Sequence, residues 1–201
     1  IELKKDNKKE AVCLVFEKVN TGGVTLSVFE LITATYAVDG VNLRDEWFGS
    51  KKDKIEGIGR WIGRQRMLAD IEPTEFFQGL SLLFTYQKRL QDISSGKTGK
   101  QITGVSAKRE SVLALPLSAY ESQKKILAEG FWKAAKFLRK ESFFSKRDLP
   151  YRTQIVPLAT VLALLGDRWL EQKVYDRICR WFWCGVLGEL YGGAVETRMA
   201  N

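Results

Sequence analysis

Apolar residues recur every three or four positions along most of this chain, which is the spacing of one face of an α-helix. The pattern is clearest over residues 73–94, 118–140 and 169–190. Residues 153–165 are almost wholly apolar, which predicts a central, buried helix. No segment of useful length alternates between apolar and polar residues as a half-buried strand does. The sequence therefore predicts an all-α protein, a multi-helix bundle arranged as two helical lobes.

The boundary between the two lobes is expected at residues 94–106, a stretch rich in Gly, Ser and Thr. This composition is typical of a flexible loop. We expect residues 1–93 to hold the first lobe and residues 107–201 to hold the second. A glycine, a lysine and a threonine at positions 96–98 do not form a phosphate-binding loop, because that motif requires glycine where Gln91 stands and a strand before the loop.

The N-terminal region predicts two helices joined by a tight turn. Residues 10–20 have a helical pattern that ends before Gly22 and Gly23. The next helix has a start signal, because Ser27 and Glu30 have the spacing of a capping box. Short helices are expected over residues 42–49 and 54–68.

Composition excludes several classes of chemistry. The chain contains no histidine, so histidine-based metal sites and Ser-His-Asp or Cys-His catalysis are excluded within these residues. Three cysteines without paired spacing indicate reduced thiols, and we expect a cytoplasmic protein without disulfides. The longest uncharged apolar run, residues 155–166, is shorter than the roughly 20 residues that cross a bilayer, so no membrane association is expected.

The net charge of +8 is concentrated in the middle of the chain. Residues 73–150 carry 14 basic and 7 acidic side chains. Such an asymmetry favours a polyanionic partner, of which DNA is the first candidate, although long basic side chains also simply solvate helix faces. The candidate contacts form two sets of basic residues: Lys133, Lys136, Arg139 and Lys140 in the middle third, and Arg60, Arg64 and Arg66 beside Trp61.

Residues 16–31, FEKVNTGGVTLSVFEL, carry a resemblance to a known family. The segment resembles the signature F-x-x-x-N-T-G-G-x-x-L-S-x-x-E-L of the ParB-like domain found at the N-terminus of GmrSD-type, modification-dependent restriction endonucleases. Two later stretches resemble the helical region that follows in that family: residues 148–158, with the sequence DLPYRTQIVPL, and the run from Arg180 to Thr197.

The resemblance implies a defence protein that recognises modified or foreign DNA, with nucleotide hydrolysis in the ParB-like domain and, in many members, a nuclease domain that contains histidine. The family's run of an acidic residue followed by Gly-Gln-Gln-Arg is absent here, as are the nuclease histidines. We therefore expect the end of the ParB-like domain within residues 1–93, the helical region after it, and no complete catalytic site in the chain. The parent protein would use a nucleoside triphosphate with a divalent metal ion.

By the same resemblance, Asn20 would help to hold nucleotide phosphates or their metal ion. The alternative is that Asn20 and the two glycines form only a turn, while Ser27 and Glu30 only cap a helix. For function, we expect DNA binding or scaffolding between an upstream ParB-like portion and a downstream nuclease domain. The alternative is a module for protein–protein interaction without nucleic-acid contact. The DNA modification that is sensed, the nucleotide and the oligomeric state stay open.

Overall fold

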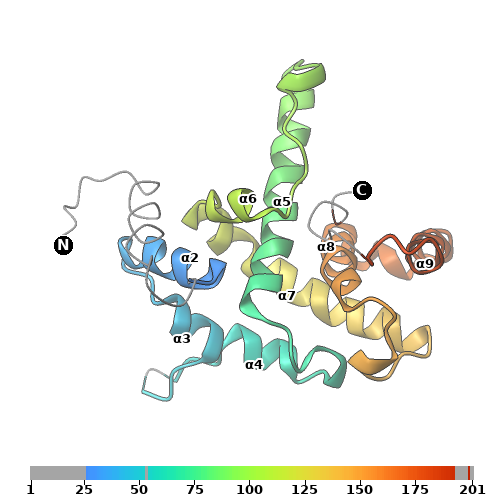
Figure 1. The fold of residues 1–201 in the computed structure, drawn as a ribbon, viewed down its shortest axis with the longest axis horizontal. Coiled ribbons are helices and arrows are strands. Elements are labelled where there is room, and N and C mark those ends of the chain that lie inside the picture. The colour runs from blue at the N-terminus through green and yellow to red at the C-terminus, as the bar shows by residue number, and fades with distance from the viewer. Residues whose placement is uncertain (1–25, 53, 193–198, 200–201) are drawn as a thin grey trace. The chain divides into compact units, whose positions relative to one another are not determined.

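The computed structural model describes residues 26–52, 54–192 and 199. These residues form eight α-helices, α2 to α9, and no β-strand (Figure 1). The all-α prediction is therefore confirmed. The chain divides into two compact units, residues 1–61 and residues 62–201, and each is described by itself. In the part of the chain that the structure describes, every helix is too short or too polar to span a bilayer.

The first unit contains α2 (Val28–Ala37), and the N-terminus of this helix is capped as the sequence predicts. The backbone N–H of Glu30 donates to Ser27 Oγ at 3.2 Å, and the backbone N–H of Ser27 donates to Glu30 Oε2 at 2.8 Å. These reciprocal bonds satisfy backbone donors that a helix start leaves unpaired. The capping role of Ser27 and Glu30 is confirmed. The predicted helix at 10–20 and the glycine turn after it lie outside the described residues.

Two short helices follow, α3 (Leu43–Phe48) and α4 (Ile58–Gly63). Gly59 packs under the indole ring of Trp47, where a Cβ atom would lie 2.7 Å from Trp47 Cε2. The helix expected over residues 54–68 is shorter than predicted, because α4 covers only Ile58–Gly63. Its glycines permit this close packing but disfavour a long helix.

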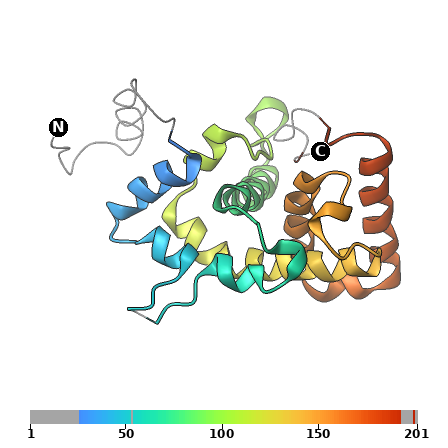
Figure 2. The same cartoon turned by 60° about the horizontal axis from the view of Figure 1, so that its bottom comes forward.

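The core of the second unit is built by three helices that pack against one another (Figure 2). They are α5 (Pro73–Ser94), α7 (Leu117–Lys140) and α8 (Ile155–Leu165). Pro73 stands at the first position of α5, where its missing N–H leaves no bond unmade. The helices bury one apolar stripe each, and aromatic rings join the stripes, with the ring centroids of Phe76 and Phe131 6.0 Å apart. Thirteen buried residues form the centre of this core: Phe76, Phe77, Leu80, Leu83, Leu127, Phe131, Ala134, Leu138, Val156, Leu158, Ala159, Leu162 and Ala163.

The helices α7 and α8 approach each other closely at Gly130. A Cβ atom on Gly130 would collide with the carbonyl oxygen of Ala159 and would lie 2.7 Å from the Cβ atom of Ala163. Small residues on both helices therefore allow the two backbones to come together. The almost wholly apolar sequence of α8 fits this position, because α8 is buried against α5 as well as α7.

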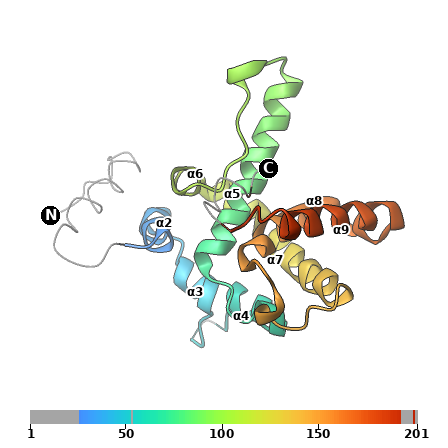
Figure 3. The ribbon, with the colours of Figure 1, turned by 45° about the vertical axis from the view of Figure 1, so that its right-hand side comes forward.

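The predicted boundary at residues 94–106 lies inside the second unit. The helices on either side of this segment, α5 and α7, both pack on α8 within the second unit, so the contacts that hold that unit together cross the segment. The division of the chain falls instead between Trp61 and Ile62. After α5 the chain turns back and runs beside the same helix (Figures 1 and 3). We call residues 95–107 the return segment; it leads into α6 (Arg109–Leu113).

The last helix, α9 (Gln172–Leu187), is shorter than the predicted range of 169–190. Residues Gly166–Leu170 form a 3₁₀-helix instead, and Leu170 is 62% exposed rather than part of the buried stripe. Gly166 adopts a φ of 60°, which breaks the continuity with α8. The described residues contain five 3₁₀-helices: η1 (Arg66–Leu68), η2 (Gly99–Gln101), η3 (Lys146–Asp148), η4 (Arg152–Gln154) and η5 (Gly166–Leu170).

Candidate functional site

The basic residues predicted to contact DNA are partly brought together by the fold of the second unit. Arg139 of α7 donates from Nη2 to Gln65 Oε1 at 3.4 Å. Gln65 stands between Arg64 and Arg66, which are both exposed. Two sets of cations that are more than 70 residues apart in sequence therefore meet on one surface. We call Arg64, Arg66, Lys136, Arg139 and Lys140 the basic surface.

The turn that carries Arg66 is held in place by a lysine that the sequence analysis did not single out. Lys146 Nζ donates to the carbonyl oxygen of Asp70 at 2.8 Å, and this bond ties η3 to the residues after η1. The side chain of Lys146 is buried, and burial lowers its pKa. Lys146 therefore supports the basic surface rather than extending it.

Two of the predicted lysines have partners within the protein. Lys133 Nζ lies 3.3 Å from a carboxylate oxygen of Asp167, so much of its charge is already balanced. Lys140 Nζ lies 4.4 Å from the centroid of the Tyr175 ring and 5.8 Å from that of Trp169. Such cation–π contacts leave the charge of Lys140 in place, and its side chain is exposed. Lys136 is also exposed.

The two remaining predictions are not joined to this surface. Arg60 is exposed and belongs to the first unit, so it is described apart from the other six basic residues. Asn20 lies outside the described residues.

A second site is formed along α5 by four polar side chains that the sequence analysis did not single out. Ser81, Thr85, Arg89 and Asp92 follow one another at intervals of four, four and three residues, so they share one face of the helix. Every one of them contacts the return segment. Ser81 Oγ donates to the carbonyl oxygen of Ser106 at 2.8 Å, and Thr85 Oγ1 accepts from the N–H of Ser106 at 3.1 Å. This polar stripe fixes the return segment against α5.

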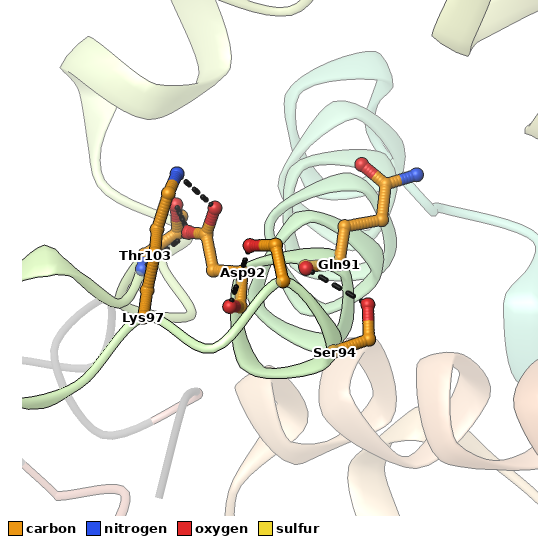
Figure 4. A network of polar contacts seen from close by, with 6 residues as sticks. Gln91, Asp92, Ser94, Lys97 and Thr103 are labelled. Carbon is orange, nitrogen blue, oxygen red and sulfur yellow. Dashed lines mark hydrogen bonds and ion pairs between the residues drawn. The ribbon is translucent and has the colours of Figure 1, made fainter.

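Asp92 is the strongest of these anchors (Figure 4). Its carboxylate accepts from Lys97 Nζ at 2.6 Å and from the N–H and hydroxyl of Thr103 at 2.8 and 2.5 Å. The residue is only 5% exposed. The Lys97 ammonium group and the two bonds from Thr103 hold the pKa of Asp92 well below its usual range. Asp92 therefore stays ionised and keeps both ends of the turn at residues 97–103 on α5.

Arg89, one turn before Asp92, contacts the same part of the return segment. Its Nη1 donates to the carbonyl oxygen of Thr103 at 3.4 Å. Arg89 also lines a groove of about 440 Å³ between α5, α8 and α9. Apolar side chains form most of the groove, among them Leu82, Val161 and Leu164. The groove is thus an apolar space with a cation in its wall.

A third cluster surrounds Glu141, directly after α7. Three side chains of α9 donate to its carboxylate: Tyr175 Oη at 2.6 Å, Cys179 Sγ at 3.3 Å and Trp183 Nε1 at 2.8 Å. They are spaced four residues apart, so one face of α9 meets a single carboxylate. Burial by itself would raise the pKa of Glu141, but these three hydrogen bonds outweigh it and lower the pKa below its ordinary value.

None of these clusters resembles a metal centre. Among the residues that the structure describes, no three Cys, Asp or Glu side chains come together in a way that could hold a metal ion. The two carboxylates at the centre of these clusters, Asp92 and Glu141, each accept hydrogen bonds from several donors. What the three sites offer is a cationic surface, an apolar groove with a cation, and a hydrogen-bonded attachment of α9.

Comparison with known proteins finds a distant relative of unassigned function. The chain is 22% identical over 202 residues to the uncharacterized protein MJ0686 of Methanocaldococcus jannaschii. The match covers 96% of this chain but 30% of the archaeal protein, so the chain spans less than a third of that protein's length. No family model matches the chain. No solved structure shows significant similarity to it.

Proposed function

We propose that the chain is the helical part of a GmrSD-like defence protein and that its second unit binds the phosphate backbone of duplex DNA through the basic surface. The observation that carries this proposal is the contact of Arg139 with Gln65, because it joins the two predicted sets of cations on one folded unit. Exposed arginines and lysines favour contacts to phosphates, which give affinity but little sequence preference.

The distribution of charge between the two units supports the same proposal. Residues 62–201 carry 22 basic and 14 acidic side chains, whereas residues 1–61 carry 10 of each. The entire net charge of +8 therefore belongs to the unit that holds the basic surface. The resemblance of residues 16–31 to the ParB-like signature supplies the defence context. The length of the archaeal relative is in keeping with a helical region inside a longer protein.

No catalytic step is assigned to this chain. The nucleotide-hydrolysis run of the related family is absent from the sequence, and Asn20, the one candidate nucleotide contact, is outside the described residues. In this proposal the nucleoside triphosphate, its metal ion and the nuclease activity belong to other parts of the parent protein. The helical chain would connect those parts to each other and to DNA.

Binding of a labelled DNA duplex across a salt series tests the proposal. We expect binding at about 50 mM salt that weakens steeply as salt rises, with the slope set by the number of phosphates that the protein neutralises. The triple variant Arg64→Glu, Arg66→Glu and Arg139→Glu should bind far more weakly. Its salt slope should fall by roughly 0.9 for each phosphate that is no longer neutralised. Circular dichroism checks that the variant is folded.

The matched control reverses three exposed cations elsewhere in the same unit. Lys125→Glu, Lys173→Glu and Arg177→Glu change the net charge by the same amount. An equal loss in both variants would mean that only net charge matters and would refute a defined surface. If the wild-type chain shows no binding at low salt and instead self-associates as its concentration rises, the alternative of a protein-interaction module is favoured. Exposed Leu187 and Leu190 at the end of α9 would then be the first surface to test.

A further inference from the structure

The groove beside α5 is a built feature of the second unit. Its walls come from α5, α8, α9 and the return segment, which contributes Val105. The polar stripe of α5 fixes the wall that the return segment forms. Asp92 of this stripe holds Thr103, which stands two residues before Val105. A volume of about 440 Å³ lies within the usual range for small-molecule sites.

Aliphatic side chains form most of the walls, and Tyr86 and Trp181 add two aromatic rings. Leu82, Val161 and Leu164 line the groove, and Leu164 is 44% exposed although it belongs to the most apolar helix of the chain. Met199 adds a flexible thioether that can adapt to the shape of a ligand. Thr160 also lines the groove, but its hydroxyl already donates to the carbonyl oxygen of Val156 at 2.9 Å. An aliphatic ligand therefore fits these walls better than a base or sugar, whose polar edges need partners.

Among the residues that the structure describes, Arg89 is the one cation in the groove lining. Its guanidinium group donates to the neutral carbonyl oxygen of Thr103, and no carboxylate of the described residues lies within ion-pair distance of it. A guanidinium group has five N–H donors, so several are available to a ligand. An arginine held beside an aliphatic groove is suited to a carboxylate, which it can bind through two parallel hydrogen bonds.

We propose that this groove binds an aliphatic monocarboxylate, with its hydrocarbon chain along α8 and its carboxylate on Arg89. Each methylene group that leaves water adds to affinity, and the charge-assisted hydrogen bonds fix the direction of the chain. The inference does not depend on DNA binding, since the groove and the basic surface use different residues.

Isothermal titration calorimetry of the full chain with decanoate below its micellar concentration tests the proposal. Decanol, which has the same chain without the charge, and decylamine, which has the opposite charge, are the matched probes. We expect decanoate to bind most tightly and decylamine most weakly. Arg89→Gln should weaken decanoate binding about tenfold, to the level of decanol, and leave decanol binding unchanged.

Two further variants separate the groove from nonspecific adsorption. Leu164→Asp places a charge in the groove wall and should abolish binding of decanoate and decanol alike. Leu187→Asp changes an exposed leucine that does not line the groove and should have no effect. Circular dichroism checks the folding of each variant. Equal binding of decanoate and decanol, an unchanged affinity in Arg89→Gln, or equal losses in the two aspartate variants would each overturn the proposal.

Discussion

The two C-terminal helices, α8 and α9, are attached to their unit in different ways. The shorter helix, α8, buries eight of its eleven residues and meets α7 backbone to backbone at Gly130. The longer helix, α9, buries only Ile178, Phe182 and Gly185. A face of α9 is held instead by side chains, with three donors on Glu141 and with Gln154 Nε2 donating to the carbonyl oxygen of Phe182 at 2.9 Å.

Both helices pack apolar side chains on their unit, but they depend to different degrees on polar contacts. Burial of apolar surface holds α8, and such an interaction has little dependence on pH or on any single polar group. The attachment of α9 relies partly on one ionised carboxylate, so it responds to pH and to the loss of one side chain. The basic residue Lys140 lies at the same junction, over the rings of Tyr175 and Trp169.

The largest effect is expected from a truncation in α8. Leu158 has no exposed surface, and Leu158→Ala should lower the free energy of unfolding by about 2–5 kcal/mol, because the change removes buried apolar atoms and leaves a cavity. Chemical denaturation measures this loss, which should affect the whole second unit in one transition. Leu187→Ala on α9 is the matched control, since Leu187 is 80% exposed and its truncation should change stability by less than about 0.5 kcal/mol. Similar losses in both variants would contradict the buried position of α8.

A smaller and more local effect is expected from Glu141→Gln. The variant keeps the shape of the side chain but removes its charge and replaces one accepting oxygen with an NH₂ group that cannot accept, so we expect a loss of about 1–2 kcal/mol. Hydrogen exchange should show faster exchange for the amides of α9, while those of α8 keep their protection. Faster exchange in both helices to the same extent would show that α9 does not detach separately.

The same variant should change the response of α9 to acid. The pKa of Glu141 is lower in the folded protein than its ordinary value, so this group stabilises the fold fully above its unfolded pKa. That stabilisation is lost as the pH falls through the folded pKa. In the wild type the exchange rates of α9 amides, corrected for intrinsic exchange, should therefore rise relative to those of α8 as the pH falls below about 4. Glu141→Gln should remove this difference.

The sequence predicts α8 better than α9 for a physical reason. Periodicity and capping signals are local, and they place α5 at Pro73–Ser94 and α7 within one residue of its predicted start. The apolar run of α8 likewise predicts a buried helix. The end of α9 and the break at Gly166 depend on tertiary packing. The pattern of apolar residues along the chain does not indicate this packing. The sequence indicates a loop at 94–106 but not its attachment, because a glycine-rich composition does not reveal the polar stripe that holds this segment on α5.

The candidate sites also show that local patterns are visible in the sequence and tertiary contacts are not. Basic residues are visible in the sequence, but the meeting of Arg139 with Gln65 requires the packing of α7 on η1. The polar stripe of Ser81, Thr85, Arg89 and Asp92 has helical spacing and could have been found beside the apolar stripe of the same helix. The cluster around Glu141 could not have been found in this way, because its three donors lie 34 to 42 residues away along the chain.

The smallest effect is expected at Cys179, and it distinguishes the thiols of α9. Burial, reinforced by the hydrogen bond to Glu141, raises the pKa of Cys179 to about 11, so the thiol stays protonated at neutral pH and reacts slowly. Cys184 on the same helix is exposed. Peptide mapping after brief alkylation should find Cys184 modified well before Cys179, and Cys179→Ser should change stability by less than about 0.5 kcal/mol. In Glu141→Gln the alkylation of Cys179 should accelerate while that of Cys184 does not. If Cys179 reacts as fast as Cys184 in the wild type, the attachment of α9 through Glu141 is looser than its hydrogen bonds indicate.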